Sequence, residues 1–591
     1  MMQKLLSGNE AIAQGAWEAG VRVGVGYPGT PSTETLENLS TYDDVYCEWS
    51  PNEKVALEVA LGSAMGGARS LATMKHVGVN VAADPLLSAC NTGVNAGLVI
   101  LAADDPSMFS SQNEQDSRNY AAFARIPMLE PADSAEAHEF VQRAFEISED
   151  FDTPVMIRES MRIAHTKSLV ECADERADVE LRDFTPDASK YVMMPAYARG
   201  RRQAVIERTG KLIEFAEETD LNRIEMRDSS VGIIASGAVY QHVREALPQA
   251  STFKLGLSWP LPPAKLRQFA EAVDHLYVVE EACDYFAEHV HALGIATEQP
   301  PVCPLPEAGE LTPALIKKSF GIALPQGHPP CDDLPPRPPS LCAGCPHRLV
   351  FTVLRDMKAI VSGDIGCYTL GATAPLSAVH STIDMGASLS VAHGLELADV
   401  PARNKRPVVG VIGDSTFAHS GITSLLGTIY NAGAGTLCIL DNRTTAMTGC
   451  QGNPCNGITL HEQVRGANPL AVRDGKRLDI EALCLALGAD EVESVDAQDY
   501  AAVKDALKGA TAANDKLSVL VFHSPCRLID RSRDGVAVVG ECRACGKCVR
   551  IGCPAIGTDE HGHAVIDPVQ CIGCGQCIQV CPFGCISKEG E

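Results

Sequence analysis

Two cysteine runs near the end of the sequence have a spacing that suits iron–sulfur clusters. The first covers residues 542–557 (CRACGKCVRIGCPAIG) and the second covers residues 571–585 (CIGCGQCIQVCPFGC). Each has three cysteines at CxxCxxC spacing and a fourth directly before proline. Where two such runs hold two [4Fe–4S] clusters, the fourth cysteine of each run binds the other cluster. The spacing therefore predicts cluster A on Cys542, Cys545, Cys548 and Cys581, and cluster B on Cys571, Cys574, Cys577 and Cys553.

Zinc is the alternative ligand for these cysteines, because CxxC pairs also form structural zinc sites. The first run has four residues rather than three between Cys548 and Cys553, an insertion that a surface loop can accommodate. Eight cysteines in this order, with both quartets closing on Cys-Pro, favour clusters over zinc. Cys585 has no place in either quartet, and we expect it to be a small buried residue.

A second chemical pattern lies between residues 408 and 449. We expect a buried strand at PVVGVIGD, a helix from Phe417 to about Ala432, and a second strand at TLCILDN. The strands of such a βαβ unit are parallel, so Asp414 and Asn442 would emerge together at the carboxyl edge, where open α/β sheets bind ligands. Carboxylate and amide oxygens suit Mg²⁺ that also binds phosphates. The alternative is that both residues only cap turns.

The elements around these residues alternate between short apolar strands and helices, which predicts α/β domains with doubly wound parallel sheets. Strands are expected at VRVGVGYP, RSLATMKH and GLVILAADD, and a second set at VGIIASG, TFKLGLSW and HLYVVEE. The segment 322–340 has seven prolines and suits a semi-rigid linker. The expected divisions are domains at 1–175, 230–321, 341–530 and 531–591, a connection at 176–229 and the linker at 322–340.

The composition is that of a soluble globular protein with several domains. The chain has 591 residues, of which 45% are hydrophobic and 21% charged. No signal peptide and no run of membrane-spanning length is seen, so we expect a cytoplasmic protein without a membrane partner. In that compartment most of the 23 cysteines would stay reduced. A net charge of −26 argues against a nucleic-acid partner.

The spacing of Gly413, Asp414 and Ser415 before Asn442 resembles the thiamine diphosphate motif. The resemblance implies that Asp414 and Asn442 bind Mg²⁺ through side chains, that Thr444 binds it through its carbonyl, and that Ser415 lies at the cofactor.

Thiamine enzymes also supply a glutamate that protonates the pyrimidine ring, usually from another α/β domain. The segment WSPNEKVALEVALGSAMGGARS looks like the helix that supplies it, with Glu53 as the candidate. Glu48 and Glu58 are the fallback choices. A glutamate in the first turn of a helix, favoured by the helix dipole, is the alternative interpretation of Glu53.

Nearly the whole chain resembles the large subunit of the indolepyruvate ferredoxin oxidoreductase family, within the 2-oxoacid ferredoxin oxidoreductases. The resemblance rests on both thiamine motifs, on the cluster runs, and on GYPGTPSTE, KHVGVNVAADPL, SSQNEQDSR and LCAGCPHR. It implies thiamine-enzyme pyrimidine and diphosphate domains, a transketolase-C-like domain at 230–321 and a two-cluster ferredoxin-like domain at the end. It also implies that Thr30, in the first motif, faces the cofactor and substrate; a plain Gly-Pro turn is the alternative.

The wider family further suggests a third [4Fe–4S] cluster beside the thiamine. The corresponding cysteines are Cys342, Cys345, Cys367 and Cys526, although some of them are alternatively buried free thiols. Gly366, in the Gly-Ile-Gly-Cys turn, is expected at the cofactor. His347 either contacts the diphosphate or lies in the core. Cys450 stands where the family's Thr-Gly-Gly-Gln has glycine, and we expect it to line the pocket without binding metal.

The activity that the resemblance implies is oxidative decarboxylation of arylpyruvates (indolepyruvate, phenylpyruvate and hydroxyphenylpyruvate). Its products would be an arylacetyl-coenzyme A and reduced ferredoxin. It also implies a separate small beta subunit as partner. The rival functions are the same chemistry on phenylglyoxylate or a branched-chain 2-oxoacid, a non-redox thiamine decarboxylase or ligase, and a pure electron-transfer subunit. The cluster runs argue against the decarboxylase, and Asp414 with Asn442 argues against the electron-transfer subunit.

Overall fold

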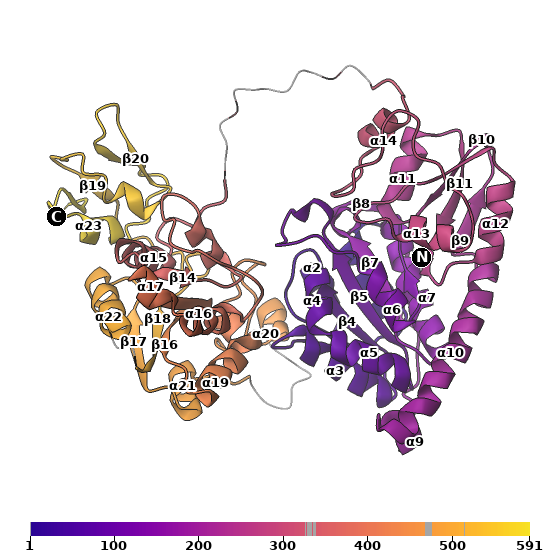
Figure 1. Ribbon diagram of the computed structural model, residues 1–591, viewed down its shortest axis with the longest axis horizontal. Helices are drawn as coiled ribbons and strands as arrows, with labels where there is room; N and C mark the ends of the chain where they lie inside the picture. The colour runs from indigo at the N-terminus through magenta and orange to yellow at the C-terminus, as the bar shows by residue number, and fades with distance from the viewer. Residues whose placement is uncertain are drawn as a thin grey trace. The chain divides into compact units, whose positions relative to one another are not determined.

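The computed structural model describes residues 2–324, 327, 334, 338–466, 475–512 and 515–590. Its contacts divide the chain into two compact units. Unit 1 comprises Met1–Pro330 and Leu460–Val472, and unit 2 comprises Cys331–Thr459 and Arg473–Glu591. Figure 1 labels their elements. Most of the linker expected at 322–340 lies outside the described residues.

Unit 1 is built around a seven-stranded sheet in the order β12-β6-β7-β5-β4-β2-β3. All neighbouring strands are parallel except β12 and β6, in agreement with the α/β prediction. The strands are β2 (Val23–Gly26), β3 (Tyr46–Trp49), β4 (Ser70–Lys75), β5 (Leu98–Asp104), β6 (Met128–Leu129), β7 (Val155–Ser160) and β12 (Leu257–Trp259). The flanking helices are α1 (Gly8–Glu18), α2 (Thr33–Leu39), α3 (Glu53–Met65), α4 (His76–Val81), α5 (Ala83–Thr92), α6 (Arg118–Ala124), α7 (Ser134–Asp150) and α8 (Met161–His165).

Both faces of this sheet are buried, as the continuous apolar character of its strands requires. In β5, Leu98 and Ile100 belong to one hydrophobic cluster, while Val99 and Leu101 belong to another. This alternation follows from the two-residue period of a strand. The sheet therefore has helices packed on each side, and its carboxyl edge is left for loops.

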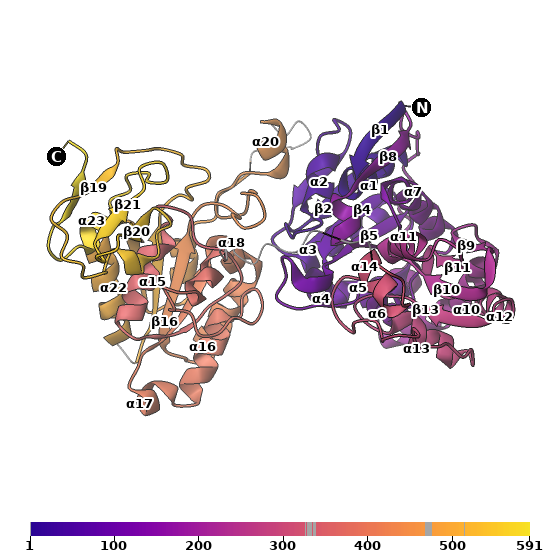
Figure 2. The same ribbon diagram turned by 90° about the horizontal axis from the view of Figure 1, so that it is seen from above.

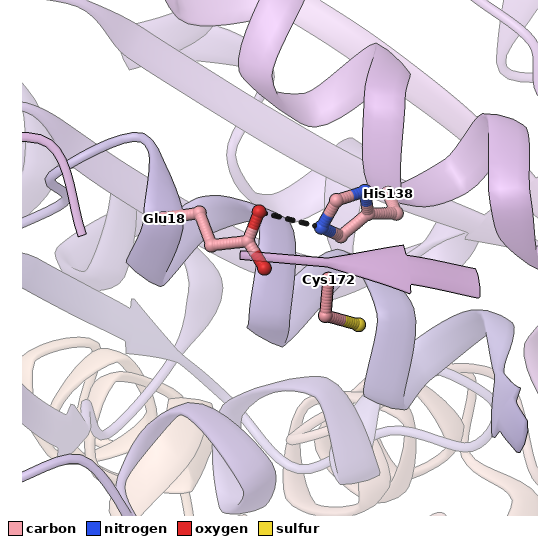
Figure 3. A group of neighbouring side chains, drawn as sticks. All are labelled: Glu18, His138 and Cys172. Atoms are coloured by element: carbon pink, nitrogen blue, oxygen red, sulfur yellow. Dashed lines mark ion pairs between the residues drawn. The ribbon is translucent and has the colours of Figure 1, made fainter. Parts of the chain in front are cut away.

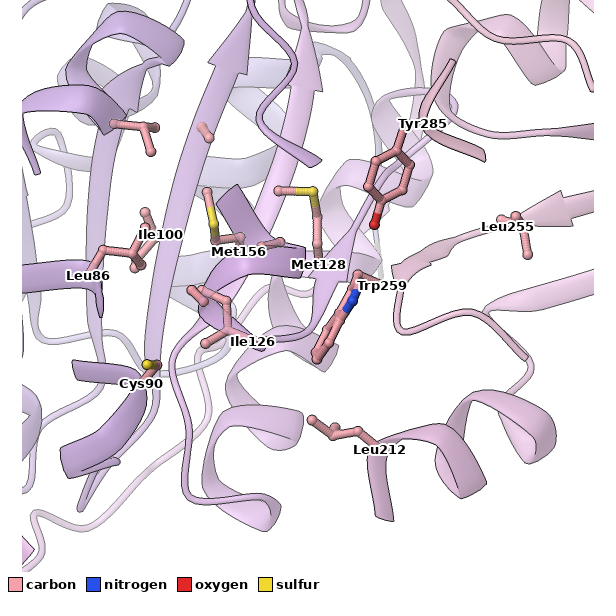
Figure 4. Close-up of a cluster of buried hydrophobic side chains, with 14 of the residues drawn as sticks. Leu86, Cys90, Ile100, Ile126, Met128, Met156, Leu212, Leu255, Trp259 and Tyr285 are labelled. Atoms are coloured by element: carbon pink, nitrogen blue, oxygen red, sulfur yellow. The ribbon is translucent and has the colours of Figure 1, made fainter. Parts of the chain in front are cut away.

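A four-stranded sheet, β13-β10-β11-β9, completes unit 1 and shares its core. Leu212, Leu255 and Tyr285 pack in one hydrophobic cluster with Met128 and Met156 of the large sheet (Figure 4). The strands are β9 (Asn222–Glu225), β10 (Asp228–Ala235), β11 (Ala250–Leu255) and β13 (His275–Val278). The helices are α9 (Ala188–Tyr191), α10 (Pro195–Glu218), α11 (Gly237–Ala246), α12 (Pro263–Glu271), α13 (Tyr285–Ala292) and α14 (Pro313–Ser319).

One expectation for this region was wrong in detail. TFKLGLSW, expected as one strand, is divided at Gly256: β11 stays in the small sheet and β12 joins the large one. A Cβ at Gly256 would lie 2.3 Å from the carbonyl oxygen of Leu221, so only glycine fits at this crossing. The connection expected at 176–229 also contains a strand, because β9 pairs antiparallel with β11.

A small antiparallel pair, β1 (Met2–Ser7) with β8 (Lys167–Cys172), lies beside α1 and α7 (Figure 2). A buried polar group anchors it, because Glu18 accepts hydrogen bonds from Gln14 Nε2 at 2.7 Å and the backbone N–H of Ala173 at 2.9 Å. The second oxygen of Glu18 pairs with His138 Nε2 at 2.9 Å, and Cys172 lies beside them (Figure 3). These contacts satisfy a carboxylate that would otherwise be costly to bury.

Unit 2 contains a five-stranded parallel sheet in the order β14-β15-β16-β18-β17. The strands are β14 (Ile360–Ser362), β15 (Val408–Gly413), β16 (Gly435–Asp441), β17 (Glu491–Asp496) and β18 (Leu517–His523). The helical elements are α15 (His347–Asp356), η2 (Cys367–Ala372), α16 (Ser388–Leu397), α17 (Val400–Asn404), α18 (Asp414–Thr416), the π-helical η3 (Phe417–Gly421), α19 (Ile422–Tyr430), α21 (Ile480–Leu487) and α22 (Tyr500–Ala512). The helix expected from Phe417 thus begins as a π-turn, a feature often found at functional sites.

One helix from the predicted 341–530 domain belongs to unit 1. It is α20 (Leu460–Arg465), where His461 Nε2 accepts a hydrogen bond of 2.9 Å from the backbone N–H of Cys47. The burial of Leu460 and His461 explains why this segment packs in unit 1.

The last part of unit 2 contains the two cysteine runs. Its elements are two antiparallel pairs, β19 (Ala537–Val539) with β22 (Ile586–Lys588) and β20 (Ile556–Thr558) with β21 (Ala564–Ile566), and the short helices η4 (Val549–Ile551) and α23 (Gln576–Val580). Its small core includes Leu349 of α15, so this segment forms one unit with the five-stranded sheet. Within the described parts of both units, none of the helices combines the length and apolar character needed to span a bilayer.

Candidate active site

The carboxyl edge of the sheet in unit 2 brings together Asp414 and Asn442. Strands β15 and β16 are parallel neighbours, with Gly413 opposite Leu440, and each residue directly follows the end of its strand. Both side chains are buried, with 2% and 7% of their surface exposed. The predicted βαβ unit therefore places two oxygen-bearing side chains at one point of the sheet edge.

Asp414 has the electrostatics expected of a cation ligand. Burial, with the charge of Asp441 adding to it, raises the pKa of the Asp414 carboxyl to about 7. Asn453 Nδ2 donates to Asp414 Oδ2 at 3.3 Å, and no basic side chain pairs with Asp414 among the described residues. A buried carboxylate without a counter-charge is destabilised, and a divalent cation would relieve this. The donor set therefore fits Mg²⁺.

Ser415 and Thr444 are connected by hydrogen bonds of the loop after β16. Thr445 Oγ1 donates to Ser415 Oγ at 2.8 Å, and the backbone N–H of Thr444 donates to Asn442 Oδ1 at 3.2 Å. Both predicted residues are buried. The loop after β16 thus turns back toward the start of α18 and lines the edge where a diphosphate would bind.

Gly366 and His347 approach the same edge through Tyr368. A Cβ at Gly366 or at Gly413 would lie 2.5 Å from Tyr368 Cε1, so the ring covers both glycines. The His347 ring stacks edge-on to Tyr368, with centroids 6.1 Å apart. Burial lowers the pKa of His347 to about 4, so this histidine is neutral at physiological pH. Both of its alternative interpretations, a core residue and a diphosphate contact, agree with this position.

In unit 1, the three candidate glutamates have different surroundings. Glu53 is the first residue of α3 and is 5% exposed. Its Oε1 lies against Gly78, where a Cβ would approach it to 2.5 Å. Glu48 accepts hydrogen bonds from Tyr46 at 2.7 Å and Ser50 at 3.0 Å, and the exposed Glu58 pairs with Lys54. Only Glu53 of the three is buried at the carboxyl edge of the large sheet.

Thr30 follows β2, the strand adjacent to the one that precedes Glu53. Its loop is held by Thr33, whose Oγ1 accepts a 2.9 Å hydrogen bond from the backbone N–H of Gly29. A Cβ at Gly29 would lie 3.1 Å from Lys75 Cβ, so the loop packs on the end of β4. Lys75 Nζ donates to the carbonyl oxygen of Ser110 at 2.5 Å. Thr30, Lys75 and the SSQNEQDSR segment (110–118) thus share one edge with Glu53.

The structure brings together the four cysteines of each predicted quartet. Cavity A is lined by Cys542, Cys545, Cys548 and Cys581, and cavity B is lined by Cys553, Cys571, Cys574 and Cys577. Burial raises the pKa of Cys548, and the nearby Cys542, Cys581 and Cys545 raise it further. Four facing sulfurs around a small cavity fit a [4Fe–4S] cluster. Cys585 lies at cavity A, where its backbone N–H donates to Cys581 Sγ at 3.3 Å, and it is half-buried, so the expectation of a buried residue was wrong.

The four cysteines suggested for a third cluster also lie near one another. Burial raises the pKa of Cys367 to about 11, and Cys526, Cys342 and Cys450 contribute to the shift. Burial also raises the pKa of Cys345, and Cys367 and Cys342 contribute to that shift. Cys450 lies close enough to Cys526 to hydrogen-bond it, so five thiols meet at this place.

Arg348 connects the Cys342–Cys345 loop to the cluster segment. Its buried guanidinium donates to the carbonyl oxygen of Cys342 at 3.1 Å and to that of Ile551 at 3.1 Å. The loop packs directly on cavity B, because a Cβ at Gly344 would lie 3.2 Å from Cys574 Cβ. The sequence analysis missed Arg348 and Lys75 as individual residues. The only signal in the sequence was position: Lys75 lies in KHVGVNVAADPL and Arg348 lies in LCAGCPHR, two of the motifs that resemble the family.

Three family models match the chain in the order of these features. Residues 14–229 match the thiamine diphosphate-binding model of pyruvate flavodoxin/ferredoxin oxidoreductase, residues 364–522 match the C-terminal TPP-binding domain of thiamine pyrophosphate enzymes, and residues 564–587 match the 4Fe-4S binding domain. The matches cover the segments that contain Glu53, Asp414 with Asn442, and one cysteine run.

Curated relatives extend the similarity over the full chain. The indolepyruvate oxidoreductase subunit IorA of Methanothermobacter thermautotrophicus is 38% identical, and the alignment covers 99% of this chain and 97% of that protein. The same subunit of Thermococcus kodakarensis is 39% identical with equal coverage. The 2-oxoglutarate synthase subunit KorA of Methanothermobacter marburgensis is 24% identical over 46% of this chain and 87% of that protein. The chain therefore belongs to the family of the indolepyruvate oxidoreductase subunit IorA, and it is a 2-oxoacid:ferredoxin oxidoreductase that uses thiamine diphosphate and [4Fe–4S] chemistry.

Proposed function

We propose that this chain catalyses the oxidative decarboxylation of arylpyruvates, with indolepyruvate, phenylpyruvate and hydroxyphenylpyruvate as substrates. The proposed products are CO₂, the arylacetyl-coenzyme A and two reducing equivalents on ferredoxin. The observation that carries the proposal is the near-full-length similarity to subunits named for indolepyruvate. The arrangement in unit 2 supports it, because the diphosphate edge and both cysteine cavities belong to one compact unit.

The proposed cofactor residues follow from their burial and chemistry. Asp414 and Asn442 would bind Mg²⁺ through side-chain oxygens and Thr444 through its carbonyl, with Ser415 and Gly366 at the diphosphate. His347 is neutral, so it would contact a phosphate only as a hydrogen-bond donor. Thiamine diphosphate, when bound, supplies the carbanion chemistry that releases CO₂.

In unit 1, Glu53 would hold and return a proton at the pyrimidine ring, and Thr30 would contact the cofactor and substrate. The burial of Glu53 supports this role because a carboxylate shielded from water interacts more strongly with a ring nitrogen. Because Gly78 has no side chain, it leaves room for the Glu53 carboxylate.

The cysteines would carry the electrons away from the substrate site. Cys342, Cys345, Cys367 and Cys526 would bind a third cluster, and the packing of Gly344 on cavity B supports transfer from there to cluster B and on to cluster A. A small beta subunit is the proposed partner, in a heterodimer or its dimer, with coenzyme A as the acyl acceptor.

The test is anaerobic reduction of methyl viologen by the holoprotein with its small partner, thiamine diphosphate, Mg²⁺ and coenzyme A. The substrates to compare are indolepyruvate, phenylglyoxylate, a branched-chain 2-oxoacid and pyruvate, with iron counted on the same sample. We expect the highest kcat/KM for indolepyruvate and about twelve irons per chain, four for each of three clusters.

Other results would change particular parts of the proposal. About eight irons with activity retained would remove the third cluster alone. A higher kcat/KM for phenylglyoxylate or the branched-chain acid would reassign the substrate. Iron without reduction by any 2-oxoacid would overturn the proposed reaction.

A further inference from the structure

Within unit 2, the two cysteine cavities differ in their distance from the thiamine site. Cavity B is lined in part by Ala343 and Gly344, which belong to the Cys342–Cys345 loop. Gln576, also at cavity B, donates to the carbonyl oxygen of Cys345 at 3.0 Å. No residue of that loop lines cavity A. Electrons that leave the thiamine site would therefore reach cluster B first and cluster A last.

Cavity A also has a cysteine at the protein surface. Cys545 is exposed, whereas every cysteine of cavity B is buried or half-buried. Phe583, which is 49% exposed, lies at the opening of cavity A with the Arg543 guanidinium 5.0 Å from its ring centroid. An exposed aromatic side chain with a charged rim is typical of the centre of a protein interface.

Basic residues gather beside cavity A, although the chain as a whole has a net charge of −26. The cysteine run at residues 542–557 has three basic side chains, Arg543, Lys547 and Arg550, and no carboxylate, and one carboxylate, Glu541, directly precedes it; all four side chains are exposed. The run at cavity B, residues 571–585, has no charged residue. The basic residues therefore belong to the run that contains the exposed Cys545.

A surface hollow extends this basic surface. Arg355 Nη1 donates to the carbonyl oxygen of Arg550 at 2.7 Å, so the end of α15 adjoins the cysteine run. Arg355, Lys358, His380 and Arg406 line a hollow of about 210 Å³ with Ala359 and Ser377, and no carboxylate lines it. The nearby Asp356 is engaged by Arg355 at 2.9 Å. We call the set Arg355, Lys358, Arg406, Arg543, Lys547 and Arg550 the basic strip.

We infer that the basic strip and Phe583 form the docking surface for a small, acidic one-electron carrier protein that takes electrons from cluster A. The inference rests on the proposed function, because that reaction supplies the electrons. Each oxidised carrier centre gains one electron and cluster A returns to its oxidised state, so one turnover reduces two carrier centres. Local positive charge offsets the long-range repulsion between two acidic proteins and steers the carrier to its electron donor.

The test is a binding measurement that needs no turnover. An oxidised, acidic two-[4Fe–4S] ferredoxin is titrated calorimetrically into the anaerobic holoprotein at low and at high salt. The variant is Lys358→Glu with Lys547→Glu, because both lysines are exposed and neither pairs with a carboxylate among the described residues. We expect Kd to rise about tenfold at low salt and its salt dependence to become much weaker.

The matched control is Lys211→Glu with Lys508→Glu, two exposed lysines outside the basic strip. Each pair changes the net charge from −26 to −30, so a general charge effect would be equal in both. Equal Kd values for the two pairs would overturn the inference. Lys358→Glu alone, which lies outside the cysteine run, should still raise Kd by a factor of two or more, and an unchanged Kd would also overturn it.

Turnover separates this inference from the proposed function. With indolepyruvate, the strip variant should show a higher KM for ferredoxin but an unchanged or higher rate with methyl viologen, a small cation. If the unmodified protein failed to reduce methyl viologen with any 2-oxoacid, the proposed function would be overturned. The Kd for ferredoxin would still test the docking surface, because the binding measurement needs no turnover. A salt-independent Kd in the unmodified protein would overturn the electrostatic docking itself.

Discussion

Glu53 and Glu58 belong to the same helix, α3, but only Glu53 is buried. We predict that Glu53→Gln lowers kcat for methyl viologen reduction by about a hundredfold or more, because the amide cannot exchange a proton with the cofactor ring. Glu58→Gln, the matched control, should stay within about twofold of the unmodified protein, because its side chain is exposed. Thiamine diphosphate should still bind to both variants. A Glu53→Gln protein with full kcat would contradict the assignment.

Glu159 in β7 gives a prediction about pH. The side chain is fully buried, neither oxygen has a hydrogen-bond partner among the described residues, and burial with the nearby Glu34 raises its pKa from 4.5 to about 8. The folded chain therefore holds this proton more tightly than the unfolded chain. Its stabilising contribution is complete below pH 4.5 and is lost as the pH rises to 8, at about 1.4 kcal/mol per unit.

Glu159→Gln removes this titration. At pH 8 the variant should be more stable than the unmodified protein by roughly 4 kcal/mol, and the difference should shrink to below about 1 kcal/mol near pH 5. Tryptophan fluorescence during thermal unfolding measures this selectively, since Trp17, Trp49 and Trp259 are the three tryptophans of the chain and all lie in unit 1. Equal pH profiles for the two proteins would refute the prediction.

At the scale of elements, the close packing of the Cys342–Cys345 loop on cavity B is the feature most open to test. Gly344 has a φ of +68°, and a Cβ there would lie 2.2 Å from Ile572 Cδ1. We predict that Gly344→Ala displaces the loop and lowers the rate of methyl viologen reduction at least tenfold, with a loss of iron. Gly535→Ala is the control, because Gly535 has a similar φ of +77° but nothing within 4 Å of its Cβ position. If both variants lose activity equally, backbone strain rather than packing is responsible.

The sequence predicted elements well where local patterns decide them. The βαβ unit with Asp414 and Asn442 at adjacent strand ends follows from apolar runs and turn residues. Pairing between strands that lie far apart in the sequence could not be predicted from such local patterns. Leu257 pairs with Leu129, and nothing in a three-residue apolar run shows which of two sheets it joins. Likewise, no sequence pattern indicates that Arg348 bonds to the carbonyl oxygen of Ile551, because backbone carbonyls carry no residue signature.

At the scale of the whole molecule, the cluster segment packs as part of unit 2. Leu349 of α15 packs in its core and Arg348 bonds to its backbone. Since metal binding stabilises the folded state that holds it, removal of the clusters should destabilise all of unit 2. The domain boundary expected at residue 531 gives no sign that unit 2 depends on the clusters, because boundaries inferred from sequence follow composition and not contacts between residues.

We predict that iron removal by an oxidant and chelator lowers the calorimetric midpoint of one transition by on the order of 10 °C. The transition seen by tryptophan fluorescence should move by less than about 2 °C, because it reports on unit 1. An equal shift in both signals would mean that the two units unfold together.

Gly256 has a mechanical consequence. It is the single residue between β11 and β12, which belong to different sheets, and the hydrophobic cluster of Figure 4 continues across both sheets. A one-residue connection has no slack, so a rotation between the two sheets would break strand pairing on one side or the other. Unit 1 therefore has no hinge at this point and moves as a rigid body there, and any opening that admits a substrate has to come from its loops or from other parts of the chain.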